Sequence, residues 1–164
     1  MKMTDVRADI PAKYKWDLTE IYADAAQFEA DFSRAKAAIA DYPKHEATIA
    51  KSAAGLYAAL SDYIKIMLLV GRLYVYAHLN SDTDKSDNKY LTLYGRAVNL
   101  LNEVRAATFF ITPSIIKIDD DVLSGWYKEE TRLCSFARMI ELARRRHPYT
   151  LSDECEKTSC RYRR

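Results

Sequence analysis

One short string in the sequence has side chains that could take part in zinc chemistry. His45 and Glu46 begin an HExxH-like string, in which two histidines one helical turn apart would hold a zinc ion and the glutamate would act as a base. The second histidine position holds Ile49, and the helix-breaking Pro43 comes just before the string. A single ligand does not hold zinc, so we predict an exposed polar loop here rather than a metal site.

A second string has the composition of a calcium-binding loop. Its oxygen-bearing side chains are Asn80, Asp82, Asp84 and Asp87. A calcium loop needs a bidentate glutamate at its twelfth position and a glycine at its sixth. A loop that starts at the first or second of these residues places Leu91 or Leu93 at the twelfth position, and neither register has the glycine. We predict a solvent-exposed turn whose Asn and Asp side chains cap the next helix.

The glycines and cysteines do not form the usual motifs for a nucleophile or a bound phosphate. No GxSxG, GxGxxG, GxxxxGKS or GxxxxGKT string can be built from the isolated glycines Gly55, Gly71, Gly95 and Gly125. Cys134 lies beside Phe136 on the apolar side of the last predicted helix, which favours a small core residue over a nucleophile. Cys134, Cys155 and Cys160 are odd in number and lack CxxC spacing, which is typical of free thiols in a reducing cytosol.

Tyrosine is unusually frequent, with 12 residues against five phenylalanines. Several tyrosines fall on the apolar faces of predicted helices: Tyr63, Tyr74, Tyr90 and Tyr94. Amphipathic rings at the edge of a core, with the hydroxyl group reaching water, are one explanation. A tyrosine wall that binds a peptide or another ligand is the other, and the sequence does not separate the two.

Charge is unevenly distributed along the chain, although 25 Lys and Arg against 23 Asp and Glu leave a net charge of only +2. Residues 131–164 hold nine basic and four acidic residues, a net charge of +5, which leaves –3 for residues 1–130. A basic end could bind nucleic acid. No nucleic-acid-binding motif accompanies it, and arginines in a last helical turn also suit the helix dipole, so we expect no nucleic-acid partner.

The elements that would position these residues are predicted to be helices. Four glycines and four prolines in 164 residues disfavour a sandwich or barrel with many tight turns, and the length fits one domain. A first helix is predicted over residues 24–41, where Phe28, Phe32, Ala35 and Ile39 repeat at three- and four-residue spacing. Pro43 is expected to end it.

Two long segments with apolar residues at alternating spacings of four and three follow. The first row is Leu56, Leu60, Tyr63, Met67, Val70, Tyr74 and Ala77. The second row is Tyr90, Tyr94, Ala97, Leu101, Val104, Thr108 and Ile111. Joined by the polar turn NSDTDKSDN, they predict an antiparallel helical hairpin. The first of these helices is also apolar off its row, at Ile64, Ile66, Leu68, Leu69 and Val75, so we expect it to be covered on several sides at the bundle centre.

The last third of the chain is predicted to contain shorter helices. Pro113 is expected to end the third helix, and residues 121–127 to form one or two turns capped by an aspartate. A final helix is predicted over residues 131–146, with one apolar face made by Leu133, Phe136, Ala137, Ile140 and Ala143. No strand pattern of useful length is visible, so the predicted fold class is all-α, an antiparallel helical bundle built around a long central helical hairpin.

The sequence favours a soluble, cytoplasmic protein. The N-terminal MKMTDVRADIP lacks the apolar core of a secretory signal. The most apolar stretch, residues 66–79, carries Arg72 near its middle and has 14 residues, whereas a membrane span needs about 20. We therefore predict no membrane partner and read this stretch as a buried core helix.

Four strings, in order along residues 8–157, resemble the N-terminal region of oligoendopeptidase F, a zinc metallopeptidase of the thimet-oligopeptidase-like superfamily. They are YKWDLTEIY, YVYAHLNSDTDKSDNKYLTLYGRA, FFITPSIIKI and HPYTLSDECEK. The resemblance implies that this helical region forms one wall of a deep channel that admits short peptides. It also implies that the zinc-binding HExxH helix lies far beyond this sequence, so no catalytic, cofactor-binding or metal residue is assigned here, and substrate-binding residues stay unknown.

The resemblance stops near Lys157. The family would continue with another amphipathic helix, but this sequence reads TSCRYRR, which looks like a truncation or a shifted reading frame. We therefore expect an irregular lead-in over residues 1–22, a helical domain over 23–157 and a non-native basic tail over 158–164. The expected partners are the missing catalytic half and, for the full-length zinc enzyme, short peptides; self-association through exposed apolar surface would fit a truncated domain.

The chain alone is expected to be inactive and to bind no zinc. Two other functions stay open at this point. A free-standing helical module could bind a partner helix through an exposed apolar face. A nucleic-acid binder that uses the basic tail is the other, less favoured, alternative.

Overall fold

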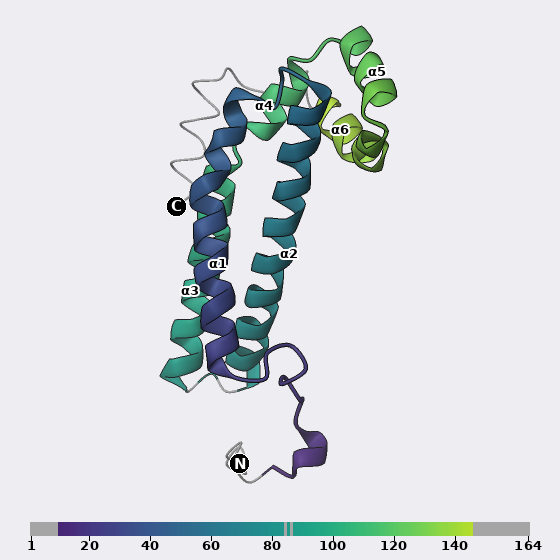
Figure 1. Ribbon diagram of the computed structural model, residues 1–164. Helices are drawn as coiled ribbons and strands as arrows, with labels where there is room; N and C mark the ends of the chain where they lie inside the picture. The colour runs from purple at the N-terminus through teal and green to yellow at the C-terminus, as the bar shows by residue number, and fades with distance from the viewer. Residues whose placement is uncertain (1–9, 84, 86, 146–164) are drawn as a thin grey trace.

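The computed structural model describes residues 10–83, 85 and 87–145. Three long helices lie side by side: α1 (Ala25–Asp41), α2 (Ala53–Thr83) and α3 (Asn88–Ala107) (Figure 1). The shorter helices α4 (Ile111–Ile116), α5 (Asp120–Glu129) and α6 (Ala137–Arg144) gather at one end of this bundle. Short 3-10 helices η2 (Ala12–Tyr14), η3 (Tyr42–Ala47) and η4 (Thr131–Phe136) complete the described elements. The described residues contain no strand, and the predicted all-α bundle is confirmed.

Helix α1 begins and ends close to its predicted limits. Asp24 caps it, because its side chain accepts a hydrogen bond of 2.8 Å from the backbone N–H of Gln27. The predicted apolar face is largely buried, through Phe28, Ala35 and Ile39. After Asp41 the chain continues into η3, because a proline is tolerated in a first helical turn, where its missing N–H would have no helical partner.

Helices α2 and α3 form the predicted antiparallel hairpin and share the most extensive helix–helix interface of the described chain. Leu60 and Val70 of α2 are buried, as are Leu100 and Val104 of α3. Helix α2 runs four residues further than predicted, from Asn80 to Thr83, into the string predicted to be a turn. The Asn80 side-chain amide donates to the carbonyl oxygen of Tyr76 at 2.8 Å, a bond that a helical last turn permits.

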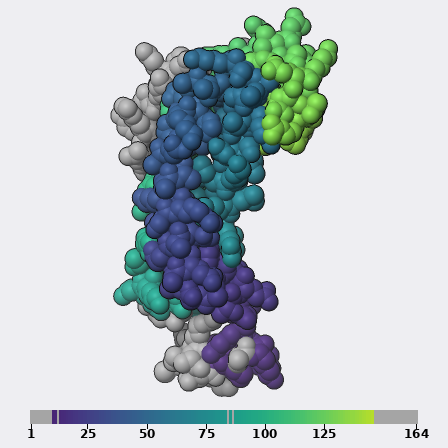
Figure 2. All heavy atoms as spheres, in the orientation of Figure 1, coloured from purple at the N-terminus to yellow at the C-terminus, as the bar shows by residue number. Residues whose placement is uncertain are grey.

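The prediction that α2 is covered on several sides is wrong for one of its faces. Ile64, Leu68 and Val75 are exposed, although Ile66 on another face is buried. The described helices pack against only part of the circumference of α2. Helices α1 and α3 lie on one side, and α5 and α6 project beside its upper end, so the lower flank stays uncovered by them (Figure 2).

The connection after α3 differs from the prediction at Pro113. Helix α3 already ends at Ala107, with the backbone N–H of Thr108 bonded to the carbonyl oxygen of Val104 at 3.0 Å. Pro113 lies in the first turn of α4 and ends no helix. A proline fits there because the first N–H groups of a helix have no intrahelical acceptor.

The last part of the described chain buries residues of the predicted apolar face, but it does so with a 3-10 helix followed by an α-helix. Asp119 is at the N-cap of α5, but its side chain makes no capping hydrogen bond. The predicted helix over residues 131–146 is split into the 3-10 helix η4 and the α-helix α6, which together bury Leu133 and Ile140. Residue Arg146, the predicted limits of the domain at 157 and the tail over 158–164 lie outside the described residues.

By length and composition alone, α2 could cross a membrane, since an 18-residue window within it has a mean hydropathy of 1.5. The helix, with 31 residues, is therefore longer than the 14-residue apolar stretch at residues 66–79. The core helix of a soluble protein passes the same test, and a third of that window is buried inside the described chain. The helix is not evidence of a membrane location.

Candidate functional site

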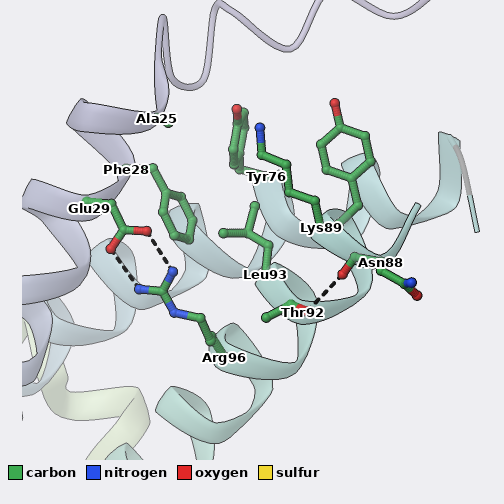
Figure 3. Close-up of a pocket in the computed structure, with 10 residues that line it drawn as sticks. Ala25, Phe28, Glu29, Tyr76, Asn88, Lys89, Thr92, Leu93 and Arg96 are labelled. Carbon is green, nitrogen blue, oxygen red and sulfur yellow. Dashed lines mark hydrogen bonds and ion pairs between the residues drawn. The ribbon is translucent and has the colours of Figure 1, made fainter.

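A groove of about 520 Å³ opens between the first turns of α1 and α3, with α2 forming its back (Figure 3). Ten residues line it: Ala25, Phe28, Glu29, Tyr76, Asn88, Lys89, Tyr90, Thr92, Leu93 and Arg96. Its lining residues come from three helices, so no local string in the sequence marks it. The sequence singled out only Tyr90 among them as a candidate binding residue.

An ion pair between α1 and α3 closes one side of the groove. The guanidinium of Arg96 donates two hydrogen bonds to the carboxylate of Glu29, at 2.6 and 2.7 Å (Figure 3). The guanidinium also lies over the ring of Phe32, 4.4 Å from its centroid. These hydrogen bonds hold the pKa of Glu29 below its usual range. The carboxylate is therefore an anchored ion-pair partner and is poorly suited to act as a general base.

Aromatic rings form the inner wall of the groove. The ring centroid of Tyr76 lies 5.6 Å from that of Phe28 and 5.2 Å from that of Tyr22, and Tyr22 meets Phe28 edge-on at 5.5 Å. The hydroxyl of Tyr22 donates to Asp31 at 3.0 Å. Burial of this ring, and then its hydrogen bond to Asp31, raise the pKa of Tyr22 above its usual range. The wall is thus a packed aromatic cluster with a fixed orientation.

Lys89 adds a positive charge to the lining of the groove. Its ammonium group, at the mouth of the groove, makes no ion pair with any residue that the structure describes. In the close-up, the side chains of Lys89 and Tyr76 extend in the same direction above Leu93 (Figure 3). A cation beside an aromatic wall can bind a carboxylate attached to an apolar group, such as the end of a short peptide.

The four candidate tyrosines do not form one wall. Tyr74 and Tyr94 meet across the hairpin, with their hydroxyl oxygens 3.4 Å apart. His78 stacks on Tyr74, with ring centroids 5.6 Å apart and planes 9° from parallel. Tyr90 lines the groove, and Tyr63 packs against the hydrophobic core. The core-edge explanation therefore fits Tyr63, and Tyr90 is the candidate tyrosine among the lining residues of the groove.

The predicted exposed loop at His45 is wrong. His45 is buried within η3, with its ring 5.1 Å from that of Tyr42 and its Nε2 atom 3.2 Å from the carboxylate of Asp62. Ile49, at the position where a second zinc ligand would stand, is fully buried. The sequence pattern could not reveal this burial, because it depends on the packing of η3 against α2.

The string with the composition of a calcium loop is divided between two helices. Asp87 caps α3 as predicted, accepting a 2.8 Å hydrogen bond from the backbone N–H of Lys89. Asp82 instead pairs with His78 at 3.5 Å, and Asn80 is buried within α2, while Asp84 lies outside the described residues. Within residues 10–83, 85 and 87–145, no three His, Cys, Asp or Glu side chains come together in a group that could hold a metal ion.

Two further candidates from the sequence are placed differently from our expectation. Cys134 is exposed rather than part of the core, because η4 turns as a 3-10 helix and buries Leu133 in its place. Cys155 and Cys160 lie outside the described residues. Every arginine of the basic end within the described chain pairs with a carboxylate: Arg132 with Glu130, Arg138 and Arg145 with Glu141, and Arg144 with Asp120. The remaining basic residues, Arg146, Lys157, Arg161, Arg163 and Arg164, fall outside it.

Comparison with known proteins gives these surfaces a context. A family model described as Oligopeptidase F matches residues 114–158. The oligopeptidase PepF of Bacillus subtilis is 32% identical over 150 residues, which cover 92% of this chain and 22% of that protein. The plasmid oligoendopeptidase F of Lactococcus lactis subsp. cremoris is 30% identical over 159 residues, which cover 94% of this chain and 26% of that protein.

The fold agrees with the sequence matches. A crystal structure of oligoendopeptidase-F from Enterococcus faecium superposes with a TM-score of 0.74 and 26% identity, over 82% of this chain and 26% of that chain. The chain thus spans about a quarter of the length of the relatives that it matches. In sequence and in fold, this chain is similar to the N-terminal helical domain of oligoendopeptidase F peptidases.

Proposed function

We propose that this helical domain forms one wall of the peptide channel of an oligoendopeptidase F-type zinc peptidase, and that peptide hydrolysis needs the rest of such a polypeptide. The observation that carries the proposal is the unequal coverage of the matches. They extend over 92% of this chain but only 22% of the Bacillus subtilis relative. The full-length partner and its short-peptide substrates, and a cytoplasmic location, are parts of the same proposal.

The described residues do not fit the zinc ion that the family implies. The two histidine–carboxylate pairs, His45 with Asp62 and His78 with Asp82, have two members each, whereas a catalytic zinc site uses three protein ligands. We therefore assign zinc to the remaining polypeptide and no catalytic or metal-binding role to the described residues of this chain. The chain by itself is expected to cleave no peptide.

The groove beside Lys89 is the described surface that we assign to the peptide channel. It combines concavity, the aromatic wall around Tyr76 and a cation without an ion-pair partner among the described residues. A second hollow of about 800 Å³ lies between α1 and α3, but its Lys36 is already paired with Glu103 at 2.7 Å. Of these two hollows in the described chain, the first therefore offers a positive charge without an ion-pair partner to a peptide carboxylate.

The test is a chimera in which this chain replaces the matched region of Bacillus subtilis oligopeptidase PepF. We expect the chimera to cleave an internally quenched short peptide, and chelation with EDTA to abolish the cleavage. The PepF remainder alone and this chain alone should both be inactive. An inactive but folded chimera, or EDTA-sensitive cleavage by this chain alone, would contradict the proposal.

A pair of variants in that chimera tests the groove. Lys89→Ala should raise KM for a peptide with a free C-terminal carboxylate several-fold and leave kcat unchanged, since it removes uniform binding. The same variant should raise KM less for the same peptide with an amidated C-terminus. Lys51→Ala, an exposed lysine that does not line the groove, is the matched control. Equal KM changes for both variants would count against this role of the groove.

A further inference from the structure

One face of α2 carries a second row of residues at alternating spacings of four and three. The row is Tyr57, Ser61, Ile64, Leu68, Gly71, Val75, His78 and Asp82. Three apolar members at its centre are open to solvent, with relative exposures of 38% for Ile64, 70% for Leu68 and 46% for Val75. We call these eight residues the outer row.

The spacing of the outer row is that of a helix–helix seam. The other row of α2 has the same period and buries Leu56, Leu60 and Val70 against the rest of the bundle. Single exposed leucines are ordinary on protein surfaces, but a continuous apolar stripe of this period is typical of a helix that packs against a partner. Gly71, between Leu68 and Val75, adds no side chain that would hold a partner backbone away.

One end of the outer row is already an interface within this chain. The ring of Tyr57 meets that of Phe136 of η4 edge-on at 5.9 Å, and the guanidinium of Arg132 lies 4.2 Å from its centroid. Beyond this point α5 and α6 project away from α2, and its lower flank is not covered by them (Figures 1 and 2). The packing therefore begins along the row and stops before its apolar centre.

The charges beside the row do not attract a polyanion. Lys65 pairs with Asp62 at 2.8 Å. Arg72 lies over the ring of Tyr22 at 4.5 Å and donates a hydrogen bond to the carbonyl oxygen of Ile21. With these cations engaged inside the chain, the outer row presents methyl and methylene groups, and its fitting partner is the apolar face of another helix.

We propose that the outer row is the surface on which a helix from the remaining three quarters of an oligoendopeptidase F-type polypeptide packs. This inference rests on the proposed function. The relatives hold about three quarters of their length outside the matched region, so they contain polypeptide that could cover the row. A second copy of this chain fits less well, because three exposed side chains form a narrow strip, and a stable interface buries about 800 Å² per partner.

The experiment places a charge at the centre of the row. Leu68→Glu is made in this chain alone and in the chimera with the Bacillus subtilis PepF remainder. Leu91→Glu is the matched control, because Leu91 is an exposed leucine of α3 outside the row, with a relative exposure of 42%. In the isolated chain, the Tm of both variants should lie within about 2 °C of the Tm of the unmodified chain, since both positions are open to water. In the chimera, only Leu68→Glu should lower Tm, by about 5 °C or more, because it would bury an unpaired carboxylate.

Each outcome decides between the proposals. If the unmodified chimera is active but Leu68→Glu and Leu91→Glu change its Tm equally, the outer-row inference is overturned. The proposed function is then unaffected. An isolated chain that sediments as a dimer, which Leu68→Glu dissociates, overturns it in favour of self-association. If the unmodified chimera is inactive, the proposed function fails, and the residue aligned with Leu68 in the Enterococcus faecium enzyme is changed to Glu instead. There, an unchanged Tm overturns the inference and a fall of about 5 °C supports it.

Discussion

Arg96 of α3 holds Glu29 of α1 through two parallel hydrogen bonds of 2.6 and 2.7 Å, although 67 residues separate them in the chain. The pair joins the two helices at the edge of the groove. It is the forked geometry in which a guanidinium binds a carboxylate most specifically. Both side chains are more than a third exposed, at 37% for Arg96 and 51% for Glu29, so water weakens the attraction.

The first prediction concerns the strength of this pair. A double-mutant cycle of Arg96→Ala and Glu29→Ala should give a coupling energy of about 0.5–1 kcal/mol, measured by urea unfolding. Arg96→Ala alone should cost more than Glu29→Ala, because it also removes the contact with the ring of Phe32 at 4.4 Å. A coupling energy near zero would mean that the interaction between Arg96 and Glu29 does not stabilise the fold in solution.

The second prediction is the pH dependence of the same pair. The pKa of Glu29 is lowered in the folded chain from an unfolded value of 4.5, so its carboxylate stabilises the fold above pH 4.5. That contribution is lost as the pH falls below 4.5 through the folded pKa. Glu29→Gln should therefore lower the stability at pH 7 to 9, where the Glu29 carboxylate is ionised, and change it little near pH 2.5, where the carboxyl group is protonated, so the acid side of the stability curve becomes flatter. Unchanged acid slopes in thermal unfolding from pH 2.5 to 7 would contradict it.

The third prediction concerns the buried hydroxyl of Tyr42. It donates a hydrogen bond of 2.9 Å to the carbonyl oxygen of Ala59 and so ties η3 to α2. Tyr42→Phe should lower the free energy of unfolding by about 1 kcal/mol, because it removes this bond and leaves the ring packing intact. Tyr14→Phe is the control, because the Tyr14 side chain is exposed to solvent. Burial raises the pKa of Tyr42 above its usual range, so its hydroxyl should resist ionisation in an alkaline spectroscopic titration.

The fourth prediction separates the roles of Arg144. Its guanidinium donates to the carbonyl oxygens of Ile115 and Ile118 and also pairs with the carboxylate of Asp120 at 2.5 Å. The Asp120 side chain is 89% exposed and that of Arg144 only 24%, so the backbone contacts should matter more than the ion pair. Arg144→Ala should cost about 1–2 kcal/mol and speed hydrogen exchange in α6, whereas Asp120→Asn should cost less than about 0.5 kcal/mol. If Arg144→Ala and Asp120→Asn lower the free energy of unfolding equally, the contribution of Arg144 comes from its ion pair with Asp120.

Several features of the fold are determined by the sequence alone. The periods of apolar residues predicted α1 and the α2–α3 hairpin, because a helix repeats its buried face every three or four residues whatever it packs against. Asp24 and Asp87 were placed at helix starts for an equally local reason, since capping involves residues two or three apart. The resemblance to the oligoendopeptidase F family was also visible in the sequence, and the comparisons confirm it.

Tertiary packing decided the rest. Residues such as Glu29, Tyr76 and Arg96 line one groove only because three helices converge there, and no spacing within a single helix indicates it. The same holds for His45, which the sequence suggested to be exposed and which η3 buries against α2. The outer row of α2 shows the limit most clearly. The sequence established that Leu68 is apolar, but only the arrangement of the other helices determined that this face of α2 stays open, because burial depends on neighbours that lie far away in the chain.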